Sequence, residues 1–580
     1  MAGMWRNVVV FCLVAATALP SSLLVAAAQA TNTTATTPIP VVGVKTGIEV
    51  NTGKRPARQN INKLYARGGP QWDLYILALS ALQAVDEADE LSYFQIAGIH
   101  GLPYSAWNGV GQVQGAPFIG YCPHGELLFS TWHRPYVVLF EQTLVSHALE
   151  IAGQYPPNVA PTYLAAAQTL RQPFWDWASD PRLPDAVTTA NTTVNGPTGK
   201  LTLRNPLYSY RFQRPAVEAS FGGPLTRYPE TIRCIGQGGN NATESDHLLG
   251  SVAGGLVSMV YDVFTRTKTF EAMAYANRNW SSFESPHNMI HVYSSCDGTL
   301  GHIDWSAFDP LFMLHHCNID RLVAMWQAIH YKDAMFNTTG VSTGEFGTPP
   351  GTHITADSPL KPFFDGNLNL HTSKSVADIR VFGYTYPELD EDEPTTPDGL
   401  ADHVRAQVNS LYGSDTQGAK HLSAPAQPKP PAGGKDDYPP PPPPACYYTA
   451  EISLDRAQIP LPVTVNLIVH GGLVLGHMSI LALPCEGTAS ASLPLREALL
   501  GGNLSLPDMT PATVIPFLEQ NLEVQISTSD GTDIPILTAP SLQLAVQDIG
   551  FVPRTNDSTF PRFGDTTRFW AMPVRQYDGC

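Results

Sequence analysis

The chain has 580 residues, of which 43% are hydrophobic and 15% charged, and its formal net charge is −17 at pH 7. This composition is typical of a globular protein, and the length exceeds one ordinary hydrophobic core, so we expect two folded domains. An acidic surface repels phosphate backbones and anionic lipid headgroups, which excludes nucleic acid and membrane surfaces as expected partners. Small neutral molecules remain open as ligands.

The first thirty residues predict a secretory signal. Arg6 supplies the positive charge, an apolar run extends from Val8 to Leu19, and Ala28-Gln29-Ala30 offers a small-x-small cleavage site. A membrane anchor is the alternative, but Pro20 interrupts the run and we find no second long apolar segment. We therefore expect a secreted protein that is cleaved after Ala30.

The sequons agree with export, whereas the cysteine count leaves one thiol to be explained. Eight cysteines are present and Cys12 leaves with the signal, so seven remain, and an odd number means that at least one thiol does not pair within the chain. Asn-x-Ser/Thr sequons in an exported chain predict N-glycosylation. Seven occur, at Asn32, Asn191, Asn241, Asn279, Asn337, Asn503 and Asn556.

Helical segments separated by long loops rich in Gly and Pro extend from about Gln71 to Trp326. Apolar residues recur at helical spacing over Trp72–Ala88 and Trp132–Ile151, and we expect further helices over Pro286–Tyr293 and Pro310–Ile329. Four helices of this kind can pack as a bundle whose interior holds a metal site. The fold class expected for this part is therefore mainly α, a four-helix bundle with long loops.

The composition changes after about Ala401. Residues 423–445 are rich in Pro, Gly, Lys and Asp and include six consecutive prolines, which favours an extended linker over a peptide-recognition ligand. Beyond it, short runs alternate apolar and polar residues and predict a small antiparallel β-sandwich. The expected divisions are a signal over 1–30, a catalytic domain over 31–400, a linker over 401–445 and the β-sandwich over 446–580.

Two groups of histidines stand out among the seventeen in the chain: His100, His124 and His133, and then His287, His291 and the adjacent His315 and His316. Two histidines four residues apart on one helix project from the same face and can bind one ion. His315 and His316 differ by about 100° around a helix, so only one of them readily points at that ion, and the spacing does not choose between them. Taken singly, each histidine is more simply a structural residue, and we expect His470 and His477 to be surface residues.

Imidazole ligands without a carboxylate favour copper. Zinc peptidases carry a glutamate directly after the first histidine of their HExxH motif, whereas Asn288 follows His287 here, which disfavours that class. Two sites of three histidines that face each other would leave open positions at which O2 can reach both metals. The pattern therefore predicts a binuclear copper site.

The residues around these histidines resemble the two copper-site signatures of fungal tyrosinases. The first signature resembles Phe94–Gly101, Tyr121–Gly125 and Phe129–Tyr136 with Glu141, and the second resembles Asp309–Arg321. The likeness spans roughly Gly43 to Tyr386, where Tyr384-Thr385-Tyr386 is similar to the Tyr-x-Tyr that ends the family's catalytic domain. The resemblance implies two copper ions per chain and assigns as their ligands His100, His124, His133, His287, His291 and His316.

Two further features are implied by the same resemblance. In fungal members a cysteine placed like Cys122 forms a thioether to the ligand histidine, here His124, which would also account for the odd cysteine; an ordinary half-cystine is the alternative. Glu284 and Asn288 resemble a pair that holds a water molecule, which takes the proton of a monophenol with a pKa of about 10. The plain alternative makes Glu284 a carboxylate favoured at a helix N-terminus and Asn288 a surface residue.

The resemblance implies a phenol oxidase that uses O2 to hydroxylate monophenols in the ortho position and to oxidise catechols to o-quinones. A β-rich segment behind a protease-accessible linker further predicts a latent proenzyme, in which the C-terminal domain is an intramolecular lid removed by cleavage between about Leu389 and Ala445. Expected partners are a small phenolic substrate and O2. The alternatives are a catechol oxidase only, an oxidase of a biosynthetic pathway acting on a specialised phenol or peptide, and a haemocyanin-like O2 carrier.

Overall fold

The computed structural model describes residues 37–577 except 215–220, 222–223, 235–239, 277–279, 390–395, 414–444, 470, 502–503 and 505. The predicted signal with its cleavage site after Ala30, His470, and three of the sequons (Asn32, Asn279 and Asn503) lie outside the described residues. The same holds for most of the predicted linker, including its prolines.

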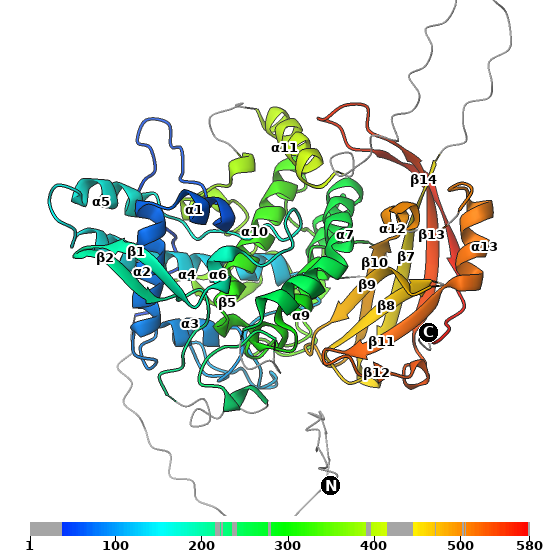
Figure 1. Ribbon diagram of the computed structural model, residues 1–580, viewed down its shortest axis with the longest axis horizontal. Coiled ribbons are helices and arrows are strands. Elements are labelled where there is room, and N and C mark those ends of the chain that lie inside the picture. Colours follow the sequence, from blue (N-terminus) through cyan, green and yellow to red (C-terminus); the bar gives the residue numbers. More distant parts are fainter. Residues whose placement is uncertain are drawn as a thin grey trace, which may run out of the picture.

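A helical domain and a C-terminal β-sandwich lie side by side (Figure 1). The helices of the first domain are α1 (Ile61–Arg67), α2 (Pro70–Ala84), α3 (Tyr93–Gly98), α4 (Phe129–Ala152), α5 (Ala160–Gln168), α6 (Asp185–Thr188), α7 (Ala242–Arg266), α8 (Phe270–Ala274), α9 (Glu284–Ser295), α10 (Leu311–Ile329) and α11 (Pro397–Tyr412). The domain also contains three two-stranded sheets: β1 (Asn191–Gly196) with β2 (Gly199–Arg204), β3 (Gly340–Val341) with β4 (His353–Ile354), and β5 (Pro359–Phe364) with β6 (Leu370–Thr372).

The four helices expected from the sequence are α2, α4, α9 and α10. Helix α4 packs against both α2 and α10, and α10 also contacts α9. Most side chains of α4 and nearly all of those of α10 are buried, because these two helices run through the centre of the domain. The mainly α fold class is confirmed.

Helix α7 corrects the expectation that no second long apolar segment follows the signal. Among the described residues it alone is long and apolar enough to span a membrane by length and composition. Its buried residues include Leu249, Val252, Leu256, Met259 and Val263, which recur at helical spacing. The helix packs on α9, on α11 and on strands of the C-terminal domain, so these contacts account for its apolar character.

Helix α11 corrects the domain boundary that was expected at 400/401. The Thr396 hydroxyl accepts a hydrogen bond from the Gly399 N–H, and Pro397 occupies the first turn, so the helix begins with an ordinary cap. Val404, Val408 and Tyr412 are buried, and the helix packs against α10 and α7. Residues 401–412 are thus part of the helical domain and not a linker, and the apolar spacing of four residues was the signal for it.

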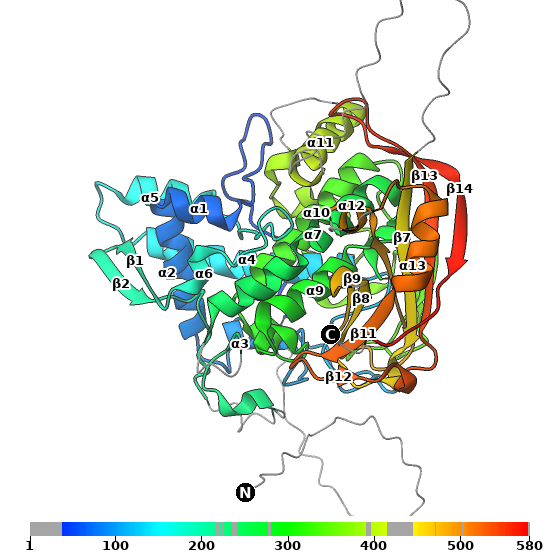
Figure 2. The ribbon, with the colours of Figure 1, turned by 45° about the vertical axis from the view of Figure 1, so that its right-hand side comes forward.

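The C-terminal domain consists of two antiparallel four-stranded sheets, in the orders β10-β7-β13-β14 and β12-β11-β8-β9, and confirms the β-sandwich. Its strands are β7 (Ala445–Asp455), β8 (Val463–Val469), β9 (Leu473–Ile480), β10 (Thr488–Pro494), β11 (Glu523–Thr528), β12 (Asp533–Ile534), β13 (Gln543–Val552) and β14 (Arg562–Ala571). Two helices, α12 (Arg496–Gly501) and α13 (Pro511–Asn521), were not expected. The sandwich lies against α7 and α9, with β9 on α9 (Figure 2).

Candidate metal centre

Three different elements position the first histidine group. His100 follows helix α3, His124 lies in the loop before α4, and His133 is on α4. The Tyr121 N–H donates to the Ile99 carbonyl oxygen at 3.0 Å, which draws the His124 loop alongside the end of α3. Gly120 permits this approach, because a Cβ atom there would lie 1.8 Å from the His100 carbonyl oxygen.

The first group forms a nearly equilateral triangle of rings. The ring centroids of His100, His124 and His133 are 5.4, 5.6 and 5.4 Å apart, and one ligand atom from each lies within 4.8 Å of the others. All three side chains are buried. Among the described residues, the Nε2 atoms of all three and the Nδ1 atom of His124 have no hydrogen-bond partner.

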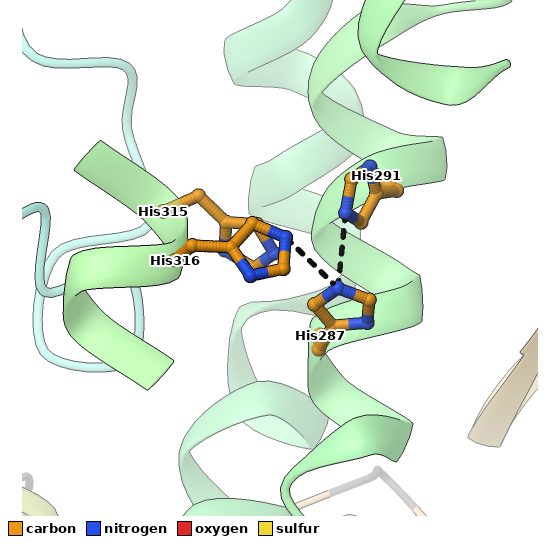
Figure 3. Close-up of side chains that lie close together, drawn as sticks. All are labelled: His287, His291, His315 and His316. Carbon is orange, nitrogen blue, oxygen red and sulfur yellow. Dashed lines mark hydrogen bonds between the residues drawn. The ribbon is translucent and has the colours of Figure 1, made fainter. Parts of the chain in front are cut away.

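The second group comes from two helices. His287 and His291 project from one face of α9, and His315 and His316 reach toward them from α10 (Figure 3). The Nε2 atom of His287 is 3.0 Å from Nε2 of His291 and 3.3 Å from Nε2 of His316. Two nitrogens that each bind one ion at about 2.0 Å in tetrahedral geometry are about 3.3 Å apart, so this spacing matches shared coordination.

The hydrogen bonds of the ring Nδ1 atoms set the tautomers. Nδ1 of His133 faces the Phe129 carbonyl oxygen and Nδ1 of His291 faces the Leu300 carbonyl oxygen, each at 2.7 Å. A carbonyl oxygen only accepts, so each Nδ1 carries the proton and each Nε2 keeps a free lone pair. Nδ1 of His287 likewise faces the Asn288 side-chain oxygen at 2.8 Å. The Nε2 lone pairs of His287 and His291 therefore face each other at 3.0 Å, which a cation between them would stabilise.

Burial keeps these imidazoles neutral. It lowers the pKa of His133 to about 3 and that of His291 to about 4. Burial together with the neighbouring imidazoles also lowers the pKa of the remaining members of both groups well below the ordinary value. A buried nitrogen without a partner costs about 1–3 kcal/mol, a cost that coordination to a metal removes. A set of neutral nitrogen donors without a carboxylate suits copper.

The two groups face each other. The rings of His133 and His316 stack with centroids 4.4 Å apart at 18°, and those of His124 and His287 are 5.9 Å apart. The structure thus brings all six predicted ligands into one buried centre that can hold two ions. His315 also belongs to this centre, because its ring lies 5.0 Å from the rings of both His287 and His291 and its ligand atom lies within 4.8 Å of theirs. The structure thus places both adjacent histidines beside His287 and His291, and the assignment of His316 as the ligand stays a prediction.

Comparison with known proteins decides the family. The model of the common central domain of tyrosinase matches residues 90–329, and that of the tyrosinase C-terminal domain matches residues 477–546. A tyrosinase of Podospora anserina is 35% identical over 390 residues, which cover 63% of this chain and 67% of that relative. The chain belongs to the tyrosinase family. Tyrosinases are binuclear copper proteins, and the two histidine groups are compatible with such a centre.

Other relatives agree with this assignment. A tyrosinase of Neurospora crassa is 33% identical over 65% of this chain and 58% of its own length, and polyphenol oxidase 3 of Agaricus bisporus is 32% identical over 59% and 62%. The chain thus spans about three fifths to two thirds of these relatives. A recombinant mushroom tyrosinase superposes with a TM-score of 0.78 at 23% identity, covering 93% of this chain and 100% of that one. The apo-protyrosinase melB of Aspergillus oryzae gives a TM-score of 0.69 at 21% identity over 94% and 99% of the two chains. These two structures confirm the fold.

Glu284 connects the two halves of the tyrosinase centre. Its Oε1 accepts a hydrogen bond from the Gly125 N–H at 2.7 Å, and its Oε2 accepts one from the Ala276 N–H at 2.8 Å. Burial raises the pKa of the Glu284 carboxyl to about 7. The carboxyl therefore ties the loop of His124 to the start of α9, a role that the sequence did not indicate because its partner Gly125 is 159 residues away.

Asn288 and Cys122 lie at the centre as well. Asn288 is buried, so the alternative that made it a surface residue is wrong. The Cys122 thiol is buried and donates to the His100 carbonyl oxygen at 3.0 Å, and its thioether to His124 stays a prediction. The described structure contains a disulfide between Cys234 and Cys296.

A buried ionic network lies beside the ligands and joins Arg134 and Asp320, from the two signatures, to Arg58 and the Tyr-x-Tyr segment. Asp320 accepts hydrogen bonds from Arg58 at 3.1 Å and Arg134 at 2.5 Å, and from the hydroxyl groups of Tyr384 at 2.6 Å and Tyr386 at 2.7 Å. Both guanidinium groups are at most 1% exposed. The network joins α4, α10 and the Tyr-x-Tyr segment, and so it sets the distance between the helices that carry His133 and His316.

Proposed function

We propose that this chain is a copper-dependent phenol oxidase made in a latent form. The observation that carries the proposal is the pair of facing groups of buried, neutral imidazoles, with the ligands His100, His124 and His133 for one copper ion and His287, His291 and His316 for the other. When bound, the two ions supply the redox chemistry with O2 that hydroxylates monophenols and oxidises catechols to o-quinones. The protein orients the imidazoles through their Nδ1 hydrogen bonds and excludes water by burial.

A thioether between Cys122 and His124 is part of this proposal. Neither ring nitrogen of His124 has a hydrogen-bond partner among the described residues, so another constraint on this ring would be useful. The bond would replace the Cys122 S–H and one ring C–H of His124, and O2 would accept the two electrons and two protons. Peptide mass spectrometry that finds a cross-linked pair two mass units lighter than the free residues supports it.

Glu284 and Asn288 are proposed to hold the water that accepts the proton of a monophenol. Each Glu284 oxygen uses one lone pair for a backbone N–H and retains another, so the carboxyl can still bind a water molecule. Asn288 lines a small cavity at the edge of the centre and is therefore accessible to such a water. A catechol oxidase is the second candidate, because both Glu284 oxygens are already engaged by backbone amides.

The C-terminal domain is proposed to be a lid over the centre. The cavity beside Asn288 is closed from the other side by C-terminal residues that include Arg456, His477 and Met478. The sequence predicted that His477 is a surface residue, and this prediction is wrong. Its Nδ1 lies 3.1 Å from the Tyr293 hydroxyl oxygen at the domain interface.

A loop of the lid reaches the loop of His124. Arg456 donates to the carbonyl oxygens of Leu481 at 3.4 Å and Pro484 at 3.2 Å, and so holds residues 481–484 in place. A Cβ atom placed on Gly125, the residue after His124, would lie 3.9 Å from the Pro484 ring. With this loop seated, a phenol cannot approach from this side.

The test combines metal analysis with oxygen uptake. We expect about two copper ions per chain, slow oxidation of phenols by the full-length protein, and fast oxidation after the lid is removed. Product analysis with a monophenol and the matching catechol separates the two candidates, since a catechol oxidase leaves the monophenol unchanged. Full-length protein that binds copper yet oxidises phenols as fast as the lidless form would contradict the lid.

We also propose that the chain is exported and N-glycosylated. The support is the signal-like N-terminus that ends at Ala30, together with sequon asparagines that are exposed in the described structure, Asn191, Asn337 and Asn556. N-terminal sequencing of protein from the culture medium should begin at Thr31. Retention inside the cell with an intact Met1 would contradict this.

A further inference from the structure

Helix α7 carries an ion pair on the face that the C-terminal domain covers. Asp262 and Arg266, one turn apart, are 3.2 Å apart, and their side chains are 0% and 4% exposed. A buried pair of charges needs further hydrogen bonds to offset the loss of its hydration. Part of those bonds comes from the other domain.

The first strand of the sandwich completes this ion pair. The Tyr447 hydroxyl donates to Asp262 Oδ1 at 2.7 Å, and the Arg266 guanidinium lies 5.5 Å above the Tyr447 ring and 5.8 Å from the Phe563 ring. The hydroxyl oxygen of Ser281 is 2.5 Å from Asp262 Oδ2 and 3.0 Å from the carbonyl oxygen of Ser492 in β10. The pair is thus enclosed by groups from both domains.

A second polar contact lies at the end of the interface near α11. The Asn409 side chain is completely buried, and its amide nitrogen donates to the carbonyl oxygens of Asp557 at 2.6 Å and Thr559 at 2.9 Å in the loop after β13. Its amide oxygen accepts from the Tyr261 hydroxyl at 2.7 Å. The side-chain NH2 group of Asn409 therefore makes two hydrogen bonds to the sandwich, and its amide oxygen makes one within the helical domain.

A third contact lies at the opposite end. The Ser529 hydroxyl, beside strand β11, donates to Asp297 Oδ1 at 2.9 Å just after α9. Together with the contact between Tyr293 and His477, polar bonds cross the interface along α7, α9 and α11. Hydrogen bonds at several separated places therefore hold the sandwich against the helical domain, and these bonds are made by residues outside the connecting segment.

We propose that these contacts keep the C-terminal domain docked after the connecting segment is cut, so that cleavage and release of the lid are separate steps. The proposal rests on the lid function proposed above. A tether contributes an effective concentration on the order of millimolar. If the interface binds with a dissociation constant of about 10 nM, most of the two fragments stay together at about 1 μM protein and the site stays covered.

The experiment introduces a specific protease site between residues 414 and 444 of the full-length, copper-loaded protein. After cleavage, size-exclusion chromatography at about 1 μM should show both fragments in one peak, with phenol oxidation no faster than before the cut. Tyr447→Phe removes only the hydroxyl that bonds Asp262, and should raise the dissociation constant about 10- to 100-fold, the effect of losing a hydrogen bond to a charged group. The cut variant should then separate and become active.

Tyr448→Phe is the matched control. It lies next in the same strand, but its hydroxyl donates to the Met509 carbonyl oxygen inside the sandwich. The cut control should stay in one peak. Asp262→Asn, which weakens the same contact from the helical side, provides a second variant if Tyr447→Phe does not fold.

Two outcomes overturn the proposal: separation of the cut wild-type fragments at 1 μM, or equal dissociation of the Tyr447→Phe and Tyr448→Phe variants. One peak with full oxidase activity would leave the docking intact and refute the lid. If the cut wild type runs as one peak, but the helical fragment freed by the Tyr447→Phe variant binds copper and never oxidises a phenol, the docking is supported and the oxidase is refuted, because chromatography and activity are measured independently.

Discussion

Replacing Glu284 with Gln changes one atom of the carboxyl and little of its size. Both of its oxygens accept backbone N–H groups, from Gly125 and from Ala276. In glutamine one of these acceptors becomes an NH2 donor, so whichever way the amide turns, one backbone N–H faces another donor. The substitution therefore acts on the proposed proton acceptor and on the anchor of the His124 loop at the same time.

The magnitudes of the two effects differ enough to separate them. Losing one hydrogen bond to a buried carboxylate costs about 1.5–3 kcal/mol of stability. Burial raises the pKa of Glu284 to about 7, so above this pH the substitution also removes a charge that burial disfavours, which offsets part of the cost. Loss of general base catalysis through a water should instead lower monophenol hydroxylation about 10²–10⁴-fold.

The assay compares monophenol hydroxylation with oxidation of the matching catechol in the lidless enzyme, together with copper content. We expect the Glu284→Gln variant to keep about two copper ions, to lose monophenol activity about 10²-fold or more, and to lose catechol activity less than about tenfold. Glu87→Gln is the matched control, because this buried carboxylate also accepts backbone N–H groups, from Gln213 and Arg214, but lies outside the centre. Equal losses on both substrates would refute the proton-accepting role, and a loss of copper would show that the anchor is what matters.

Three further substitutions test the centre and the two domains. His287→Ala should lower copper content from about two ions to about one and abolish oxidation, while exposed His353→Ala should leave both unchanged; full loading of the first variant would contradict the ligand assignment. Asp320→Asn should lower the free energy of unfolding by about 3–5 kcal/mol, because it leaves the buried Arg134 guanidinium without its carboxylate and Arg58 with Glu141 alone; a change in the thermal midpoint of less than a degree would contradict this. Burial raises the pKa of Glu451 to about 7, so this group stabilises the fold below its unfolded pKa of about 4.5, and about 3 kcal/mol of that stability is lost as the pH rises to 7. Glu451→Gln should therefore weaken the dependence of the thermal midpoint on pH between pH 5 and 8. A pH dependence equal to that of the wild type would refute the role of this carboxyl.

Local patterns in the sequence were sufficient for much of the secondary structure. The pair of histidines four residues apart predicted one helix face, and α9 places both rings on it. The alternating runs after residue 446 predicted the sandwich. The predicted boundary at 401 is wrong because it rests on composition, whereas Val404, Val408 and Tyr412 have the spacing of a helix.

The sequence by itself determined the donor set of the metal centre, the class of each domain and the likeness to the tyrosinase family, because ligand type, periodicity and motif spacing are local properties of the chain. Only the tertiary structure decided which distant groups meet. It placed Glu284 on the backbone of Gly125, brought His315 into the centre beside His316, and turned His477 from an expected surface residue into an interface contact. These outcomes depend on how α4, α9, α10 and the sandwich pack together. Packing is set by the burial of side chains that are far apart in the sequence, so the spacing of residues within one segment does not predict it.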